Sequence, residues 1–202
     1  MLPMADVKRD LPVLAFKSQQ AWDTWLASQP AGSKGLWLKL AKKSSGIASI
    51  SKAEALDCAL CHGWIDGQLD RFDDDFWLIR FTPRQATSKW SEKNRARALE
   101  LVELKRMRPA GLQQIESAKR DGRWDAAYAS QRTAQIPEDL RAALARNKKA
   151  KAFFEALDSH NRFAILYRLQ DAKKAETRAA RLEKYVAMLV DGQTIYPRKA
   201  KP

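Results

Sequence analysis

The segment Ala59–Asn94, ALCHGWIDGQLDRFDDDFWLIRFTPRQATSKWSEKN, decides the fold of this 202-residue chain. It predicts a helix that ends at Gly63, two strands over Trp64–Leu69 and Asp75–Thr82, and a second helix that begins at Ser91. The acidic run DRFDDD between the two strands indicates an exposed hairpin loop. Because several elements meet in so short a stretch, we expect any functional site of the protein to lie here.

The residues before this segment predict the rest of a small sheet. Residues 35–43, GLWLKLAKK, alternate leucine with other side chains, which is typical of a strand, and an edge strand is expected at residues 14–16. Ser18 suits the N-cap of one helix, and Ser51 with Glu54 forms a capping box that opens another. The order predicts an α+β fold, in which a small mixed or antiparallel sheet has helices on one side.

After Pro83 the pattern is helical throughout, which predicts an all-helical C-terminal region. The expected helices cover residues 92–107, 112–122 with a continuation over 123–130, 137–147, 149–157, 159–172 and 173–192. The last is amphipathic, with Ala175, Ala179, Leu182, Val186 and Leu189 at helical spacing, and a fraying basic tail follows it. We therefore expect a small α+β domain over residues 12–85 and a helical region over residues 86–202.

The positive charge is concentrated in the second half of the sequence. Residues 1–90 carry 12 Lys and Arg against 10 Asp and Glu, whereas residues 91–202 carry 25 against 14, which accounts for most of the net charge of +13. A basic half can meet nucleic acid, anionic lipid or an acidic protein, or it can be a solvated helical surface. A solvated helical surface is the more ordinary interpretation.

The sequence favours a cytoplasmic protein without a membrane span. Its first residues, MLPMADVKRD, contain no apolar signal-peptide core, and no apolar run reaches the roughly 20 residues that cross a bilayer. The two cysteines, Cys58 and Cys61, provide no disulfide framework and suit a reducing compartment.

The run Cys58-Ala-Leu-Cys61-His62 has the letters of a c-type haem attachment motif, but its context disfavours that use. Both cysteines fall inside an amphipathic helix, where a small buried side chain is the ordinary interpretation, and a zinc site would need further ligands. A thiolate near a helix C-terminus is disfavoured by the helix dipole. No hydrolase, phosphate-loop or metalloprotease motif occurs, so we expect neither a cofactor nor a metal.

The residues that best suit a binding site combine aromatic rings with charged and polar side chains. They are Trp64, Asp66, Arg80, Arg84, Ser88, Trp90 and Asn94. Arginines beside tryptophan faces suit an anionic or planar ligand, through bidentate hydrogen bonds and stacking. A structural alternative is that Asp66 and Arg80 are cross-strand partners, because buried charges require partners.

A second candidate surface lies on the last predicted helix, where Lys174, Arg178 and Arg181 share a face. This face would suit phosphate contacts and predicts, as an alternative, nonspecific nucleic-acid binding. Glu176 and Glu183 interleave with these residues, and no aromatic residue for base stacking stands on the same face.

Several motifs resemble those of the YdeI/OmpD-associated, or bacteriocin-protection, proteins. EALDCALCHGWIDG at residues 54–67 and RFTPRQATSKWSEKN at residues 80–94 resemble the family pattern EALD-ALC-GWIDG followed by RFTPR-S-WS-N, and KAETR at residues 174–178 resembles its C-terminal signature. The resemblance extends over nearly the whole chain, from Phe16 to Val190. It implies a part in bacteriocin protection or stress tolerance and assigns no reaction or cofactor.

These observations leave three hypotheses for function. The first is a non-enzymatic cytoplasmic protein that binds a small anionic or planar ligand or confers stress tolerance. The second is nucleic-acid binding through the basic C-terminal helix. The third is an enzyme at the tryptophan–arginine group, with Asp66 as its acid or base. The sequence names neither the ligand nor the oligomeric state.

Overall fold

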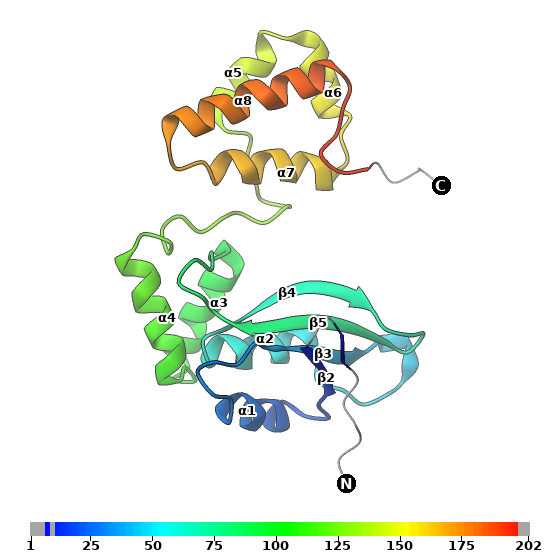
Figure 1. Ribbon diagram of the computed structural model, residues 1–202, viewed down its shortest axis with the longest axis vertical. Helices are drawn as coiled ribbons and strands as arrows, with labels where there is room; N and C mark the ends of the chain where they lie inside the picture. Colours follow the sequence, from blue (N-terminus) through cyan, green and yellow to red (C-terminus); the bar gives the residue numbers. More distant parts are fainter. Residues whose placement is uncertain (1–6, 9–10, 198–202) are drawn as a thin grey trace. The chain divides into compact units, whose positions relative to one another are not determined.

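The computed structural model describes residues 7–8 and 11–197, and the chain forms two compact units, Met1–Ala127 and Tyr128–Pro202 (Figure 1). All seven tryptophans lie in the first unit and all four tyrosines in the second. Among the described residues, no helix is both long and apolar enough to cross a membrane.

The first unit contains a five-stranded mixed sheet with strand order β1-β2-β3-β5-β4. The strands are β1 (Val7–Lys8), β2 (Leu11–Ala15), β3 (Leu36–Ala41), β4 (Trp64–Arg71) and β5 (Phe76–Pro83). Strands β2 and β3 are parallel, and the other neighbouring pairs are antiparallel. The predicted α+β class with a small mixed sheet is therefore confirmed.

Two helices, α1 (Gln19–Ala27) and α2 (Lys52–Cys61), cover one face of this sheet (Figure 1). Both begin at the predicted caps: Ser18 accepts from the backbone N–H of Ala21, and Ser51 forms the reciprocal capping box with Glu54. Their apolar sides bury the leucines of β3, together with Trp22 and Phe81. On the opposite face Trp37 and Leu78 pack with Leu11 and Val13 in a separate small core.

Two further helices, α3 (Glu92–Glu103) and α4 (Pro109–Arg120), pack against α2 through a second core. Leu101 and Ile115 meet Leu60 there, and Trp90 and Trp124 close it with their ring centroids 4.8 Å apart. This shared core places α3 and α4 in the same compact unit as the sheet, so that unit extends to Ala127, beyond residue 85.

The described residues of the C-terminal unit form four helices around their own core. They are α5 (Glu138–Ala145), α6 (Lys148–Glu155), α7 (Ser159–Gln170) and α8 (Ala175–Val190). The helical continuation expected over residues 123–130 is wrong, because turns replace it. Asn161 binds the backbone N–H and carbonyl of Tyr196 at 2.9 and 3.2 Å, whereas the basic residues of the tail that was expected to fray lie outside the described residues.

A close backbone approach joins α4 to the end of α2. A Cβ atom at Gly111 would lie 2.3 Å from the Cys61 carbonyl oxygen and 2.7 Å from that of Leu60, which no side-chain rotation relieves. Nothing lies within 4 Å of a Cβ atom at Gly32. Gly111 is therefore required by packing, whereas Gly32 is not.

We expect Gly111→Ala to lower the free energy of unfolding of the first unit by about 1–3 kcal/mol, since the added methyl group must push two helices apart. Gly32→Ala is the matched control and should change it by no more than about 0.5 kcal/mol. Urea unfolding followed by tryptophan emission measures this unit alone, because the second unit has no tryptophan. Equal midpoints for the two variants would contradict the close approach.

Candidate functional site

The sheet register separates the two residues that were expected to pair across strands. Asp66 of β4 lies opposite Phe81, whose ring packs in the core beneath α1 and α2, whereas Arg80 lies opposite Trp37 on β3. Because alternate residues of a strand point to opposite faces, Asp66 and Arg80 lie on different faces of the sheet. The predicted Asp66–Arg80 pairing is therefore wrong. Asp66 instead accepts a hydrogen bond from Asn94 Nδ2 at 3.3 Å.

Arg84 and Trp90 do meet, as part of the protein interior. The Arg84 guanidinium carbon lies 3.5 Å from the centre of the Trp90 ring, and its Nη1 donates to the Lys89 carbonyl at 3.2 Å. Both residues are buried. The Ser88 carbonyl accepts from Arg123 Nη1 at 2.8 Å, which connects the loop after β5 to the turn after α4.

Trp64 belongs to a different core, where its ring packs edge-on against Trp25 with centroids 5.7 Å apart. The seven candidate residues therefore do not surround one cavity: they divide among the Asp66–Asn94 contact, the Arg84–Trp90 stack with Ser88, the Trp64 core and the opposite sheet face with Arg80. A ligand role for them stays a prediction.

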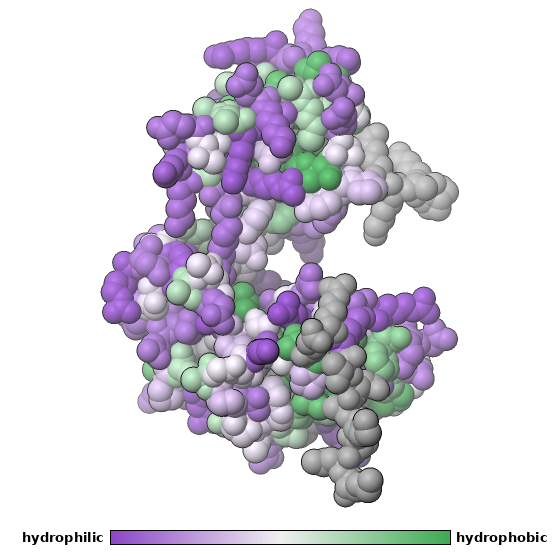
Figure 2. Space-filling model, viewed as in Figure 1, coloured by the Kyte–Doolittle hydropathy of each residue, from purple (hydrophilic) through white to green (hydrophobic). Residues whose placement is uncertain are grey.

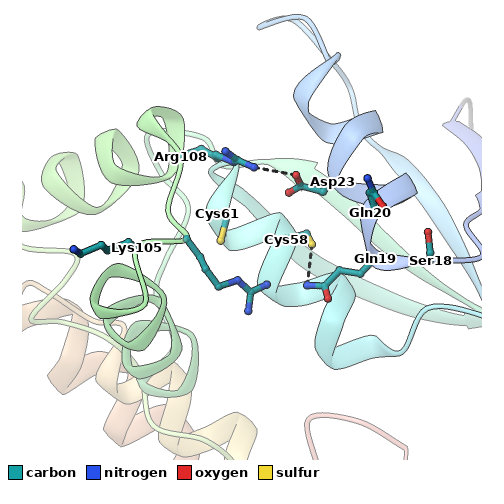
Figure 3. A pocket seen from close by; sticks show the side chains of 9 residues that line it. Ser18, Gln19, Gln20, Asp23, Cys58, Cys61, Lys105 and Arg108 are labelled. Atoms are coloured by element: carbon teal, nitrogen blue, oxygen red, sulfur yellow. Dashed lines mark hydrogen bonds and ion pairs between the residues drawn. The ribbon is translucent and has the colours of Figure 1, made fainter.

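A pocket of about 690 Å³ lies beside α2, between α1 and the loop that joins α3 to α4 (Figure 3). We call it the α2 pocket. It is lined by Ser18, Gln19, Gln20, Asp23, Cys58, Cys61, Lys105, Arg106 and Arg108. Three basic residues and one acidic residue line this pocket, so its lining has an excess of positive charge.

Ion pairs hold two of the basic side chains. Arg108 Nη2 lies 3.2 Å from Asp23 Oδ2 (Figure 3), and the other oxygen of Asp23 is 2.9 Å from His62 Nε2. Arg106 Nη1 lies 3.5 Å from Asp57 Oδ2, a carboxylate that also binds Arg97. These carboxylates orient the guanidinium groups while leaving other donors of each available, since one guanidinium has five N–H groups.

The backbone turn that delivers the basic residues is unusual. Lys105 has φ 55°, the one left-handed conformation outside glycine in the described part of the chain. Its N–H donates to the Val102 carbonyl and that of Arg106 to the Leu101 carbonyl, bonds that close the C-terminus of α3 where glycine is the usual residue. A lysine there costs about 1–2 kcal/mol relative to ordinary backbone.

The sequence did not predict this pocket because the helix over residues 92–107 was expected to be longer than it is. Helix α3 ends at Glu103, and the residues expected to form its last turn become the loop that lines the pocket. The signal available in the sequence was the run KRMR at residues 105–108, which has three basic residues in four positions directly before Pro109.

The two thiols of the α2 pocket are buried and neutral. Cys58 Sγ accepts from Gln19 Nε2 at 3.4 Å (Figure 3), and each cysteine is 3% exposed. Burial raises the pKa of Cys58 and raises that of Cys61 to about 11, although the positive charge of Arg106 opposes both shifts. Neither thiol is therefore activated as a nucleophile. Among the described residues, no group of three His, Cys, Asp or Glu side chains could hold a metal ion.

The basic residues expected to contact nucleic acid are largely engaged within the C-terminal unit. Arg178 binds Asp139 through Nε at 2.6 Å and Nη2 at 2.9 Å, and its Nη1 donates to the Leu169 carbonyl at 2.7 Å. Arg181 Nη1 donates to the Arg168 carbonyl at 2.5 Å. Lys174 is exposed at the start of α8.

Arg178 joins α8 to α5 and α7, and its hydrogen bonds hold the pKa of Asp139 below the ordinary value. Because the folded-state pKa is lowered, this stabilisation is present above the ordinary carboxylate pKa and is lost as the pH falls through the lowered value.

Two family models match separate parts of the chain. Residues 14–114 match the family described as Domain of unknown function (DUF8412), and residues 133–192 match the family described as Bacteriocin-protection, YdeI or OmpD-Associated. The expected resemblance to the latter is confirmed over the C-terminal part, whereas the sequence motifs had suggested that it covers nearly the whole chain. No curated protein and no solved structure matches the chain.

We expect Arg178→Lys to destabilise α5 and α8 by roughly 1–2 kcal/mol, since lysine keeps the charge but cannot bind Asp139 bidentately. Hydrogen exchange of the intact protein, resolved by mass spectrometry, should show faster exchange in these two helices. Lys174→Ala, which removes an exposed charge near the same helix end, is the control and should leave exchange unchanged. If hydrogen exchange in Arg178→Lys equals that of wild type, the Arg178 side chain does not stabilise α5 and α8.

The alkylation rate of Cys61 by iodoacetamide should still be rising at pH 10, because its pKa is about 11 and only the thiolate reacts. Arg106→Leu should lower the rate at each pH, since the nearby positive charge favours the thiolate. Arg120→Leu removes an exposed arginine outside the pocket and serves as the control. A rate that levels off at or below pH 9 would show that burial does not govern this thiol.

Proposed function

We propose that this chain, which belongs to the family described as Domain of unknown function (DUF8412) and carries a bacteriocin-protection, YdeI or OmpD-associated domain, is a non-enzymatic binding protein for a small, multiply charged anion. The binding site of this proposal is the α2 pocket. The observation that carries it is the placement of Arg106 and Arg108 on one cavity of about 690 Å³, whose lining also includes Lys105. Cavities of this size accommodate small organic ligands as well as simple anions.

The N-terminus of α1 supports the choice of an anion. Ser18, Gln19 and Gln20 form this helix start and line the pocket, and no acidic residue occupies the first turn of α1. The first N–H groups of a helix and its dipole both favour a negative charge at this end. The positive end of α1 and the basic loop therefore face the same cavity from two elements.

The backbone strain at Lys105 gives separate support. A glycine would adopt φ 55° without cost, whereas here Lys105 holds this conformation directly before Arg106 of the pocket. Residues held in unfavourable backbone conformations cluster at functional sites. The raised pKa values of the two thiols support binding over covalent catalysis, because neutral thiols are poor nucleophiles.

The proposal includes a cytoplasmic location and a part in stress or bacteriocin tolerance. Two free, buried cysteines suit a reducing compartment. The tolerance role follows from the description of the family model that matches residues 133–192. Nucleic-acid binding is the less favoured alternative, because Arg178 and Arg181 are bound within their own unit.

Pyrophosphate at low ionic strength is a suitable first probe of the α2 pocket. We expect it to raise the unfolding temperature measured by tryptophan emission, as any ligand that binds only the folded state must. Arg106→Gln should weaken pyrophosphate binding in calorimetry by roughly ten- to a hundredfold, the value of a charge-assisted hydrogen bond of about 1.5–3 kcal/mol.

Arg120→Gln is the matched control, since it removes one positive charge from an exposed site of α4 that does not line the pocket. It should bind pyrophosphate as wild type does. Equal weakening in both variants would indicate a general charge effect and contradict the proposal. So would the absence of any stabilisation by pyrophosphate, phosphate or sulfate.

A further inference from the structure

Part of the apolar side of α8 is not covered by its own unit. Tyr185 and Leu189 are buried, whereas Leu182 and Val186 are only half-buried and Ala179 is exposed. The sequence pattern combined Ala179, Leu182, Val186 and Leu189 in one amphipathic stripe, of which the core buries only Leu189 fully. Figure 2 shows hydrophobic side chains among hydrophilic ones on the surface of this unit.

The uncovered residues line a groove of about 500 Å³ beside α5. We call it the α5–α8 groove. On one side it is bordered by Ala143 of α5 and by Asn147, the N-cap of α6. On the other side it is bordered by Leu182, Val186 and Val190 of α8. The three α8 residues follow one another at four-residue intervals, so they form an apolar strip along the helix.

The charge of the groove is opposite to that of the unit around it. Residues 128–202 contain 16 Lys and Arg against 8 Asp and Glu, yet the charged residues that line the groove are Glu183 and Asp191. Within the described part of the chain neither carboxylate forms an ion pair, whereas Asp139 and Asp171 of the same unit pair with arginines. Two exposed acids without ion pairs among the described residues, placed beside an apolar strip, favour a partner with basic side chains, because complementary charge across an interface selects the partner.

The spacing of these residues suits a helical partner. Glu183 and Asp191 are eight positions apart, which places them roughly 12 Å apart along the helix axis at about 1.5 Å per residue. A helix that lies in the groove repeats its side chains at the same interval, so it can direct apolar residues at Val186 and basic residues at both carboxylates.

We propose that the α5–α8 groove binds an amphipathic helical segment of another protein or peptide, whose apolar stripe is flanked by lysine or arginine. This inference goes beyond the anion site of the first unit and does not depend on it. The partner contributes the apolar side chains that cover Leu182 and Val186 and the cations that pair with Glu183 and Asp191.

The test uses the full chain and a short fluorescein-labelled peptide of leucine and lysine at helical spacing, measured by fluorescence anisotropy. A peptide with glutamate in place of every lysine is the matched probe of opposite charge. We expect the lysine peptide to bind and the glutamate peptide to bind at least tenfold more weakly. Glu183→Gln with Asp191→Asn should weaken the lysine peptide by roughly three- to tenfold, the value of two exposed ion pairs.

Glu155→Gln with Glu176→Gln is the control pair, because it removes two exposed acids of the same unit that do not line the groove. Its affinity for the lysine peptide should equal that of wild type. Val186→Lys, checked for folding by circular dichroism, should abolish binding by placing a charge on the apolar strip. If Val186→Lys does not fold, the variant with Glu183→Gln and Asp191→Asn still tests the proposal.

Three outcomes overturn the proposal. Equal binding of the two peptides would remove the charge argument, and equal loss in the groove and control variants would place the peptide elsewhere. Sedimentation of the unliganded protein tests the remaining occupant: a dimer that Val186→Lys dissociates would show that a second copy of the chain covers the groove.

Discussion

The first unit depends on one backbone contact, the approach of the α4 N-terminus to the C-terminus of α2. The Arg108 N–H donates to the Cys61 carbonyl at 3.1 Å, and a Cβ atom at Gly63 or Gly111 would strike carbonyl oxygens of the facing element at 2.9 and 2.3 Å. A helix C-terminus has carbonyls without intrahelical partners, and here one of them is satisfied by the neighbouring helix start. This contact fixes the distance between the thiols of α2 and the arginines before α4, and therefore the form of the α2 pocket.

Local sequence signals were sufficient for elements that are fixed by contacts between residues only a few positions apart. The capping residues Ser18 and Ser51, the alternating leucines of β3 and the strands on either side of DRFDDD all involve residues within a few positions, and the structure has these elements close to their predicted bounds. The α+β class followed from their order. The confirmed family resemblance also came from short, specific runs such as KAETR.

The candidate sites were harder to predict because they depend on register and on where a helix stops. Asp66 and Arg80 were considered as cross-strand partners, but Asp66 lies opposite Phe81, one residue away. The pairing of β4 with β5 is irregular between Asp66 and Leu69, so the register at the hairpin loop does not extend unchanged to Asp66. The end of α3 depends on Lys105 adopting a conformation in which glycine is expected. The sequence therefore extended the helix through the residues that the structure places in the pocket.

Charged residues that look alike in the sequence have different roles once their partners are known. Arg178 binds Asp139 and the Leu169 carbonyl, and Arg84 lies on the Trp90 ring, so both side chains connect elements within the protein. Such pairs are costly to break but leave little of the guanidinium for a ligand. The basic residues of the α2 pocket differ because their carboxylate partners engage only some of their donors and because they border an open cavity.

Net charge is therefore a poor guide to what this chain binds. The value of +13 would suggest one anionic partner for the whole protein, yet the two cavities have linings of opposite sign: basic in the α2 pocket and acidic in the α5–α8 groove. Charges beyond about 8–10 Å are screened at physiological salt, so each cavity presents mainly its own lining to a ligand. The two ligands proposed for these cavities have opposite charge and need not compete, because each would respond to the charged groups within a few ångströms and not to the net charge of the chain.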